Sequence, residues 1–574
     1  MRVLSYFFIP VFLILTEQLF SQYTKHQEDF SSPLNIPLYL SGNFGEIRST
    51  HIHSGLDIKT QQQTGKEVFA SKEGYVSRIK VQSGGYGNSL YILHPDGYTT
   101  VYAHLNDVLP EIAAYIKNMQ YAQRKFEIDV FPEKYRFSVS RGQLIAHSGN
   151  TGNSGGPHLH FEIRDAYQEP LNGLKFHFEI QDNIAPVIYN LVVYPVGDKS
   201  LINGKNKKLF ITPVRTNGKY RLPDSVIISG NAGFGIETYD YLNGSGNRCT
   251  VYSIKLSVND TVYYYHEMDK FAFSEVKYLN SHIDYEAKVI GNLTIHRLFL
   301  DPNNHLSIYK IIKDKGMISF KRDSVYNINI EVKDAYMNSA ELNFVVKGAE
   351  IENSIWQKPA DSSYIKVFHY DQINTYQTPE IRLMLPEYSL YRDIPFKYSS
   401  VKTDSLPYSD LHFVHADLTP LCSSYNISIR TRNLPPNLTK KAFIAMVDRE
   451  NKIYSYGGTW QKGFITATAD CFGKFFIMLD TIAPDIKPVN FRTNSHYAAD
   501  DRISFEIQDD LTGIKSYNGY IDNEWALFEY DRKTNTLLYK IDKERLIKGK
   551  KHSLELVVVD DRDNISVYKS GFYY

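Results

Sequence analysis

The chain has 574 residues, which is too many for a single hydrophobic core and predicts three or four domains. It carries 64 basic and 64 acidic residues, so its net charge of +0 does not favour nucleic acid or an anionic membrane surface as a partner. Aromatic residues make up 14% of the chain, with 44 Tyr and 32 Phe, and these residues favour β-sheet.

The first residues read MRVLSYFFIPVFLILTEQLFSQ. One Arg precedes a short apolar run, and small or polar residues follow near Ser21, which is typical of a secretory signal peptide over residues 1–21. The run is too short to span a membrane, and no later stretch is long enough, so we expect no transmembrane anchor. The sequence therefore predicts an exported protein, either periplasmic or secreted.

Residues 33–180 combine glycine-rich turns, apolar strands and most of the notable histidines. Inside this region, DVLPEIAAYIKNMQYAQRKF has apolar residues at helical spacing after a proline that suits a first helical turn. We expect a helical insert at about 107–140 within a domain that is otherwise an antiparallel β-sheet.

Two later stretches resemble each other. DNIAPVI begins at Asp182 and DTIAPDI at Asp480, and they are followed by GFGIETYD and LTGIKSYNGYID respectively. Each copy then closes with an apolar strand and a polar turn, IEVKDAYMNSAEL in the first and LVVVDDRDNISV in the second. Short strands, polar turns and the absence of a helix signal favour immunoglobulin-like β-sandwich modules.

We therefore expect a mainly β chain, with about three β-sandwich modules after the first domain. The modules are expected at 181–348, 349–479 and 480–574. The first of them is longer than the last because of an insertion around Lys270 to Gly316. Two of the three cysteines, Cys422 and Cys471, lie in one expected module, where a disulfide and free thiols are equally compatible with the sequence.

A set of histidines and one aspartate is the main candidate for chemistry. RSTHIHSGLDIKT contains His53 and Asp57, TTVYAHLND contains His104, and GGPHLHFEIR contains His158 and His160. Alternate residues of a strand face the same side, so His158 and His160 project together. An H-x-H pair alone is weak evidence, because surface strands also carry such pairs. The three pieces in this order are much stronger evidence.

These pieces closely resemble the lysostaphin/LytM-type zinc endopeptidases of bacterial cell walls. The likeness depends on HSGLDI from His53, YAHL from Tyr102 and SGNTGNSGGPHLHFEIR from Ser148, and it covers roughly Gly42 to Arg164. A longer insert than in the shorter family members follows YAHL, and we expect it to reshape the substrate groove.

The resemblance implies that His53, Asp57 and His160 bind one Zn²⁺ per chain, and that His104 and His158 are catalytic histidines that do not bind the metal. Two imidazoles and one carboxylate leave one position of a tetrahedral zinc for water, which is typical of a catalytic site. One catalytic histidine would take the proton of that water and the other would donate a hydrogen bond to the developing oxyanion. The sequence does not assign these two roles.

Neighbouring residues receive lesser roles. His51 has no counterpart in the family's set and is expected at the rim of the site. Glu162 shares a strand face with the H-x-H histidines; it suits either a partner that orients a ligand or a surface carboxylate, and the surface role is favoured. Ser154 in GNSGG lacks the strand and helix that flank a serine nucleophile, so we expect it in a loop. HEMDK from His266 lacks the second histidine of a zinc helix.

The resemblance implies a zinc-dependent endopeptidase that hydrolyses peptide cross-links of peptidoglycan, with stem peptides or cross-bridges as its substrates. A second hypothesis is a non-catalytic regulator or scaffold that binds cell-wall hydrolases or peptidoglycan. Relatives of that kind lose metal ligands, whereas this chain keeps the whole set. We expect the C-terminal β modules to position the enzyme or to bind protein partners or glycan.

Overall fold

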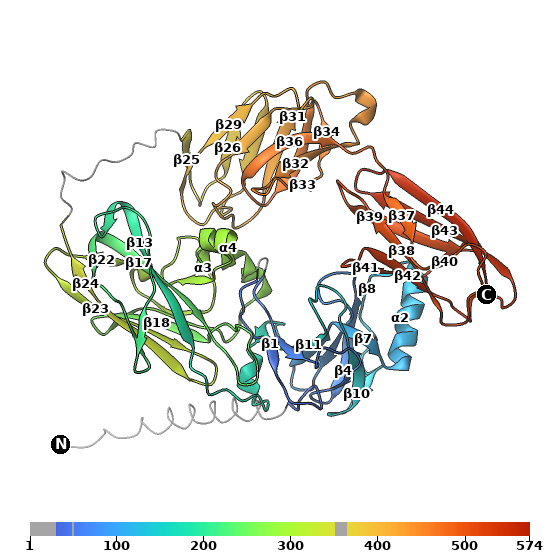
Figure 1. Ribbon diagram of the computed structural model, residues 1–574, viewed down its shortest axis with the longest axis horizontal. Coiled ribbons are helices and arrows are strands. Elements are labelled where there is room, and N and C mark those ends of the chain that lie inside the picture. The colour runs from blue at the N-terminus through green and yellow to red at the C-terminus, as the bar shows by residue number, and fades with distance from the viewer. Residues whose placement is uncertain (1–29, 49–50, 351–363) are drawn as a thin grey trace, which may run out of the picture.

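The computed structural model describes residues 30–48, 51–350 and 364–574 (Figure 1). The predicted signal peptide, residues 1–21, lies outside the described residues. Nearly all of the regular structure in the described ranges is β, which confirms the prediction of a mainly β chain. None of the helices in these ranges has the length and apolar character needed to cross a bilayer.

The first domain contains two antiparallel sheets around one hydrophobic core. The larger sheet has the strand order β1-β2-β11-β6-β5-β4-β8, with β12 beside β11 and β9 beside β4, and the smaller one has the order β3-β10-β7. The strands are β1 (Leu40–Gly42), β2 (Leu56–Lys59), β3 (Glu67–Phe69), β4 (Gly74–Val81), β5 (Ser89–Leu93), β6 (Thr99–Ala103), β7 (Leu105–Val108), β8 (Ile128–Val130), β9 (Ser138–Val139), β10 (Leu144–Ser148), β11 (His158–Arg164) and β12 (Pro170–Leu171), with a 3₁₀ turn η1 (Gly173–Phe176) after them.

The expected helical insert is present as α2 (Pro110–Gln123). Pro110 suits the first turn, where its missing N–H would have no partner within the helix, and Arg124 ends the helix in the left-handed conformation. Ile112 is fully buried and Ile116 partly buried against the core of the first domain. The helix is therefore packed on the domain and does not project from it.

The next region forms one hydrogen-bonded sheet of twelve strands. Parallel pairing of β17 with β24 joins two antiparallel halves, and side chains of both halves form a single core. The strands are β13 (Val187–Ile202), β14 (Leu209–Ile211), β15 (Val214–Thr216), β16 (Lys219–Arg221), β17 (Val226–Tyr239), β18 (Ser253–Val258), β19 (Thr261–Glu267), β20 (Ile295–Arg297), β21 (Tyr309–Ile312), β22 (Ile318–Phe320), β23 (Val325–Lys333) and β24 (Ser339–Gly348). The expected insertion holds β20, β21, α3 (Leu279–His282), α4 (Tyr285–Gly291), and the 3₁₀ turns η2 (Phe273–Tyr278) and η3 (Asp314–Gly316).

The third region is built from two five-stranded sheets and the short β25–β28 pair, around its own core. Its elements are β25 (Lys366–Phe368), β26 (Asn374–Gln377), β27 (Ile381–Leu385), β28 (Ile394–Phe396), β29 (Tyr398–Val401), β30 (Leu411–Val414), β31 (Tyr425–Arg430), η4 (Pro436–Leu438), β32 (Ala442–Val447), β33 (Ile453–Ser455), β34 (Thr459–Gln461), β35 (Phe464–Ala469) and β36 (Gly473–Leu479). Cys422 and Cys471 are free thiols, as is Cys249.

The last region has two four-stranded sheets, in the orders β37-β38-β42-β41 and β40-β39-β43-β44, around a fourth core. Its strands are β37 (Asp485–Pro488), β38 (Arg502–Gln508), β39 (Ile514–Ile521), β40 (Glu524–Ala526), β41 (Glu529–Asp531), β42 (Thr536–Lys540), β43 (Lys551–Asp560) and β44 (Ile565–Tyr573).

The two repeats that begin at Asp182 and Asp480 correspond at their starts and ends. Their middle segments do not correspond in the way that the sequence suggested. Strand β17, which carries GFGIETYD, pairs with β13 just as β38 pairs with β37. Strand β39, which carries most of LTGIKSYNGYID, pairs with β43 just as β18 pairs with β23. The counterpart of GFGIETYD is therefore the strand that ends in EIQDD, and the expected match of the middle segments is wrong.

The regions follow one another around a ring, so that the last region lies beside α2 and β8 of the first (Figure 1). At this closing contact, Lys117 Nζ lies 2.9 Å from the Asp542 carboxylate. The Arg545 guanidinium lies over the Tyr121 ring, 3.4 Å from its centre.

The junction between the first and second regions is of another kind. Leu242 and Cys249, which follow β17, belong to the hydrophobic core of the first domain, and Ala335 and Tyr336 pack against it. The first two regions therefore share apolar packing.

Candidate metal centre

The register of three neighbouring strands brings the predicted residues together. In the antiparallel pairs of β11 with β2 and with β6, His160 lies opposite Asp57 on one side and Ala103 on the other. His104 is the residue that follows Ala103 at the end of β6. Residues that are far apart in the sequence thus meet because their strands are neighbours in one sheet.

The alternation along β11 separates core from site. Leu159 and Phe161 are at most 1% exposed and belong to the hydrophobic core. His158 and His160 therefore project from the opposite face of the strand, as the sequence predicted.

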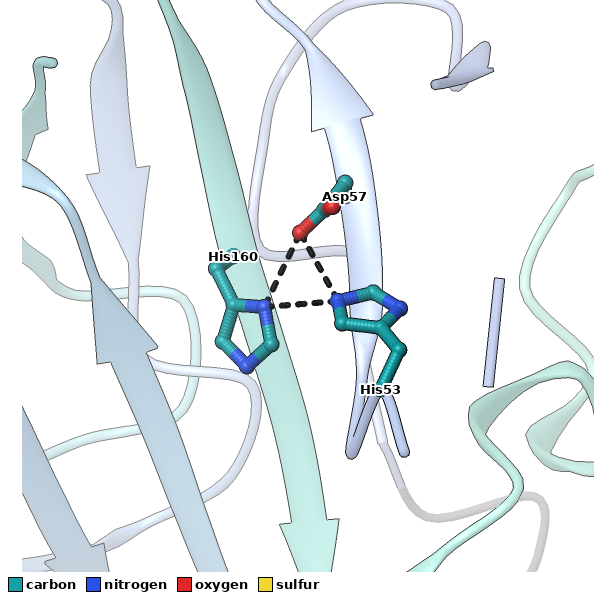
Figure 2. A group of neighbouring side chains, drawn as sticks. All are labelled: His53, Asp57 and His160. Atoms are coloured by element: carbon teal, nitrogen blue, oxygen red, sulfur yellow. Dashed lines mark hydrogen bonds and ion pairs between the residues drawn. The ribbon is translucent and has the colours of Figure 1, made fainter. Parts of the chain in front are cut away.

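His53, Asp57 and His160 form one buried cluster (Figure 2). Asp57 Oδ1 lies 3.0 Å from His53 Nε2 and 2.9 Å from His160 Nδ1, and the two nitrogens are 3.0 Å apart. His53 comes from the turn before β2, Asp57 from β2 itself and His160 from β11. These three residues could hold a metal ion.

The hydrogen bonds on the outer side of each imidazole show which atoms face the centre. His53 Nδ1 donates to the Asn43 carbonyl at 2.7 Å, and His160 Nε2 donates to Glu162 Oε1 at 2.8 Å. In the neutral tautomers, the inner nitrogens therefore carry lone pairs. Together with the Asp57 oxygen, they place three acceptors and no donor around one point, which fits a cation.

The electrostatics agree with this arrangement. Burial lowers the pKa of His160, but hydrogen bonds to Asp57 and Glu162 outweigh the burial and raise it to about 9. Burial also raises the pKa of Asp57, yet the three histidines around it hold that pKa well below its usual range. The cluster therefore attracts one positive charge to its centre, and a metal ion competes with a proton for that place.

The second oxygen of Asp57 is held by a residue that the sequence analysis did not single out. Arg48 Nη2 donates to Asp57 Oδ2 at 2.5 Å and to Glu46 at 2.9 Å. Burial lowers the pKa of Arg48, and the two carboxylates raise it to above its usual value. By holding Oδ2, Arg48 therefore orients the Asp57 carboxylate so that Oδ1 points to the centre of the cluster.

Glu162 is not a surface carboxylate, and the favoured sequence interpretation was wrong. It is 1% exposed and accepts hydrogen bonds from Ser54 and Tyr86 as well as His160. Arg164 donates to its other oxygen at 2.6 Å. A buried carboxylate is tolerated when it is paired in this way, and here the pairing fixes the ring of His160.

His104 and His158 lie beside the cluster, and their ring centres are 4.7 Å apart. His104 Nδ1 donates to the Thr151 carbonyl at 2.8 Å, and His158 Nδ1 donates to the Gly156 carbonyl at 2.9 Å. In both neutral rings, Nε2 is therefore a free acceptor. Burial, together with His160 and His158, lowers the pKa of His104 to about 3.

His158 Nε2 is the inner of these two acceptors. It is buried without a hydrogen-bond partner and lies 3.3 Å from Asp57 Oδ1. A neutral imidazole in this position can accept a proton from a group at the centre of the cluster.

The backbone around His104 is strained, and the glycine-rich loop fits against it. His104 has φ of 60°, which is uncommon outside glycine and is often seen at functional sites. A Cβ on Gly149 would lie 2.7 Å from the His104 carbonyl and 2.4 Å from the Asn106 nitrogen. Only glycine therefore lets this loop run against the turn that presents His104.

The remaining residues considered from the sequence lie outside the cluster. His51 is exposed at the rim. Ser154 lies in the loop, and its hydroxyl donates to the Gly156 carbonyl. Two other histidines of the first domain also lie outside the cluster: His94 is buried and held between the Glu73 carbonyl and the Thr100 hydroxyl, and His147 pairs with Asp107 at the surface.

Sequence reasoning missed five supporting residues, namely Asn43, Arg48, Ser54, Tyr86 and Arg164. Arg164 was within reach, because HLHFEIR places it on the same strand face as His158, His160 and Glu162. Asn43 and Tyr86 lie in turns, and no periodicity marks them.

The last region of the chain touches the loop that supports His104 and His158. Lys533 Nζ donates to the Asn150 carbonyl and lies 3.5 Å from the Ser154 carbonyl. A cavity of about 940 Å³ lies between this region and the first domain, and Thr151, α2 and β42 contribute to its walls.

Two stretches of the chain match known protein families. The profile of Peptidase family M23 matches residues 51–121 and 130–173, which include all five of the predicted site residues. The N-terminal domain belongs to peptidase family M23. Residues 365–480 match the Zu5-like domain and include the two sheets of the third region.

Curated relatives match the same part of the chain. A protein of Haemophilus influenzae named an uncharacterized metalloprotease is 34% identical over 139 residues, which are 24% of this chain and 23% of that protein. The DD-carboxypeptidase/endopeptidase Mpg of Neisseria meningitidis is 32% identical over 118 residues, 21% of either chain. The peptidoglycan DD-endopeptidase ShyA of Vibrio cholerae is 31% identical over 159 residues, 26% of this chain and 30% of ShyA. The chain thus spans less than a third of the length of each of these three relatives.

Proposed function

We propose that the protein is a zinc-dependent endopeptidase that hydrolyses peptide cross-links of bacterial peptidoglycan. The observation that carries this proposal is the convergence of three buried acceptor atoms beside two neutral histidines with free Nε2 atoms. The M23 match supports the peptidase class, and relatives named as DD-endopeptidases support the substrate class.

The ligand atoms favour zinc over other biological cations. His53 and His160 offer nitrogen and Asp57 offers oxygen, a mixed set that suits a tetrahedral Zn²⁺, whereas Ca²⁺ and Mg²⁺ prefer oxygen alone. Three protein ligands leave one position open, as in other catalytic zinc sites. A bound zinc would supply Lewis-acid chemistry by acidifying water and polarising the scissile carbonyl.

The protein side chains would then move and hold protons. His158 Nε2 is the acceptor nearer to the cluster and takes the proton of the attacking water. We assign the oxyanion side to His104, on the other side of the ring pair. Because its Nδ1 proton is already held by the Thr151 carbonyl, Nε2 would donate only with a second ring proton, which the negative charge of the oxyanion would have to stabilise against the low pKa of this ring. Thr151 and Gly156 fix the tautomers of both rings through their carbonyls.

The same proposal extends to the rest of the chain. We infer that residues 181–348, 349–479 and 480–574 are separate modules, that they position the first domain or bind partners, and that the protein is exported. The separate hydrophobic cores of the second, third and last regions support the division. Relatives that act on peptidoglycan support the location.

The test is digestion of purified peptidoglycan by the purified protein, followed by mass spectrometry of the released fragments. We expect fragments with newly opened peptide bonds and about one zinc per chain by elemental analysis. A chelator should remove the zinc and the activity together, and added Zn²⁺ should restore both.

Two variants make this test specific. His160→Ala should lose both the zinc and the released fragments, whereas His147→Ala, which changes a surface histidine of the same domain, should keep both. Full activity of His160→Ala would refute the assigned chemistry. A zinc-loaded protein that opens no peptide bond in walls of several types would favour the non-catalytic regulator.

A further inference from the structure

Three aspartates from distant parts of the chain meet at the junction of the first two regions. Asp182 precedes β13, Asp240 follows β17 and Asp334 follows β23. One carboxylate oxygen of each lies within 4.8 Å of the others, and no histidine or cysteine atom of the described residues joins the group. We call these three residues the junction cluster.

One carboxylate oxygen of Asp240 has no hydrogen-bond partner. Its side chain is 1% exposed, and its Oδ1 is buried with no hydrogen bond. In the part of the chain that the structure describes, no Lys, Arg or His forms an ion pair with any of the three aspartates. A buried carboxylate in this state costs free energy unless a cation is present.

The three charges also act on one another. Burial and the charges of Asp182 and Asp334 raise the pKa of Asp240 to about 8. Burial raises the pKa of Asp182 to about 6, with a further contribution from Asp334. Carboxylates in such an arrangement either take up protons or share a metal ion.

The last region contains three equivalent aspartates, but there the protein itself supplies hydrogen-bond donors to the carboxylates. Asp480 precedes β37, Asp509 follows β38 and Asp560 ends β43, and their oxygens also lie within 4.8 Å of one another. The framework is the same in both copies. Asn338 donates to Asp334 and to the Asp182 carbonyl, just as Asn564 donates to Asp560 and to the Asp480 carbonyl.

Donors from the protein satisfy the second cluster. Asp509 Oδ2 accepts from the backbone nitrogens of Thr512 and Gly513, both at 2.7 Å. The Thr512 hydroxyl donates to Asp480 Oδ2 at 2.5 Å. No such donor reaches Asp240 Oδ1. The two clusters thus differ at one carboxylate: the protein donates hydrogen bonds to Asp509 but none to Oδ1 of the equivalent Asp240.

We propose that the junction cluster of Asp182, Asp240 and Asp334 binds one Ca²⁺, and that the corresponding cluster of the last region does not. Oxygen-only ligands and irregular geometry suit Ca²⁺, which takes six to eight oxygens and completes its shell with water and backbone carbonyls. Zinc prefers nitrogen or sulfur ligands, which this cluster does not offer.

All three aspartates belong to the second region, so the bound ion would order the part of that region that packs on the first domain and contacts the metal centre's surroundings. The backbone of Asp240 pairs with Cys249 in both directions at 2.9 Å. The next residue, Thr250, exchanges two hydrogen bonds with the side chain of Asn43, at 2.8 and 2.9 Å. The carbonyl of Asn43 is the atom that orients His53.

The test is isothermal titration of CaCl₂ into the full chain after removal of metals and reloading with one equivalent of zinc. We expect one Ca²⁺ per chain for the wild type and for Asp509→Asn, and none for Asp240→Asn. Binding that survives Asp240→Asn, or that is lost only in Asp509→Asn, would overturn the proposal, as would no binding by the wild type.

Thermal unfolding gives a second measurement, in which the difference in unfolding temperature between Asp240→Asn and the wild type should change sign when Ca²⁺ is added. At pH 9, above the raised pKa of about 8, Asp240 is a buried charge, so without Ca²⁺ Asp240→Asn should unfold at a higher temperature than the wild type, by a few degrees. With Ca²⁺ the order should reverse, because only the wild type is stabilised by the ion. If Asp240→Asn does not fold, Asp182→Asn serves instead, because its side chain is only partly buried. The same order with and without Ca²⁺ would contradict the proposal.

The Ca²⁺ site does not depend on the proposed peptidase function. The junction cluster shares no residue with His53, Asp57 and His160, so the zinc content of each variant is measured separately. An inactive wild-type protein that still loses Ca²⁺ binding in Asp240→Asn would refute the function and support the site.

Discussion

His160 lies directly opposite Asp57 in the pairing of β11 with β2, and its Nδ1 is 2.9 Å from the Asp57 Oδ1. A shift of this register by one residue would turn His160 into the core and Leu159 to the metal centre. The apolar face of β11 thus fixes the position of the ligands, because Leu159 and Phe161 must stay buried.

The roles proposed for His104 and His158 should be separable from metal binding. We expect His104→Gln and His158→Gln to keep about one zinc per chain while kcat falls by about 10²- to 10⁴-fold, because neither ring belongs to the ligand set. The pH profile of residual activity assigns the base, since its loss removes the acid limb of kcat/KM. His147→Gln is the matched control, and loss of zinc in both variants would contradict the assignment.

Glu162 should tune the affinity for the metal without binding it. In Glu162→Gln, the side chain keeps its shape but no longer carries the charge that His160 and Arg164 face. We expect zinc affinity to fall by about 10- to 100-fold, measured by competition with a chelating dye. Glu169→Gln changes a partly exposed carboxylate in the turn after β11, where it pairs with Lys270, and should leave zinc affinity unchanged. Equal affinities in the two variants would rule out the orienting role of Glu162.

Asn43 links the metal centre to the second region. Asn43→Ala removes both hydrogen bonds to Thr250 and leaves a buried N–H and a buried carbonyl unpaired. We expect a loss of about 1–3 kcal/mol in the free energy of unfolding, measured in urea. Zinc affinity should fall as well, because the Asn43 carbonyl that orients His53 is no longer anchored. An unchanged zinc affinity would show that the carbonyl is held without Thr250.

A buried histidine cluster in the second region should make stability depend on pH. His266, His282 and His296 are at most 1% exposed, and burial lowers the pKa of all three, that of His296 to about 4. The unfolded chain takes up protons below about pH 6.5 while the folded chain does not, so stability is full above pH 6.5 and falls as the pH drops towards 4.

The size of this effect follows from the linkage relation. Each of the three histidines contributes up to about 1.4 kcal/mol per pH unit across that window. Urea unfolding at pH 7.5 and 5.0 measures it, and His296→Gln should reduce the difference between the two pH values. The exposed His305 provides the control, since His305→Gln should keep the wild-type difference. No difference in the wild type would mean that these histidines charge without unfolding.

The sequence predicted the site better than its surroundings. The H-x-H alternation gave the facing of His158 and His160, because strand periodicity is a local property. The burial of Glu162 is not local. It depends on Arg164, Tyr86 and Ser54, which surround the carboxylate and pair with it. Without such partners, a glutamate near the end of a strand is expected at the surface.

The repeats show a similar limit. Their Asp-x-Ile-Ala-Pro starts and their closing Asp-x₃-Asn turns are distinctive, and the structure places both ends equivalently. The middle strands share only an alternation of apolar and polar residues, which fits several strands of a sandwich equally well. The strand pairing shows that GFGIETYD corresponds to the strand before Asp509, and no local sequence pattern specifies which strands pair.

The closing contact of the ring differs in kind from the contact at its start. Leu242 and Cys249 are buried in the first domain's core, whereas the last region meets α2 mainly through the ion pair of Lys117 with Asp542 and through Arg545 and Trp525 against the Tyr121 ring. Attraction between exposed charges weakens as salt rises, while apolar packing does not. High salt should therefore separate the last region from α2 first, while the first two regions stay joined through their shared core.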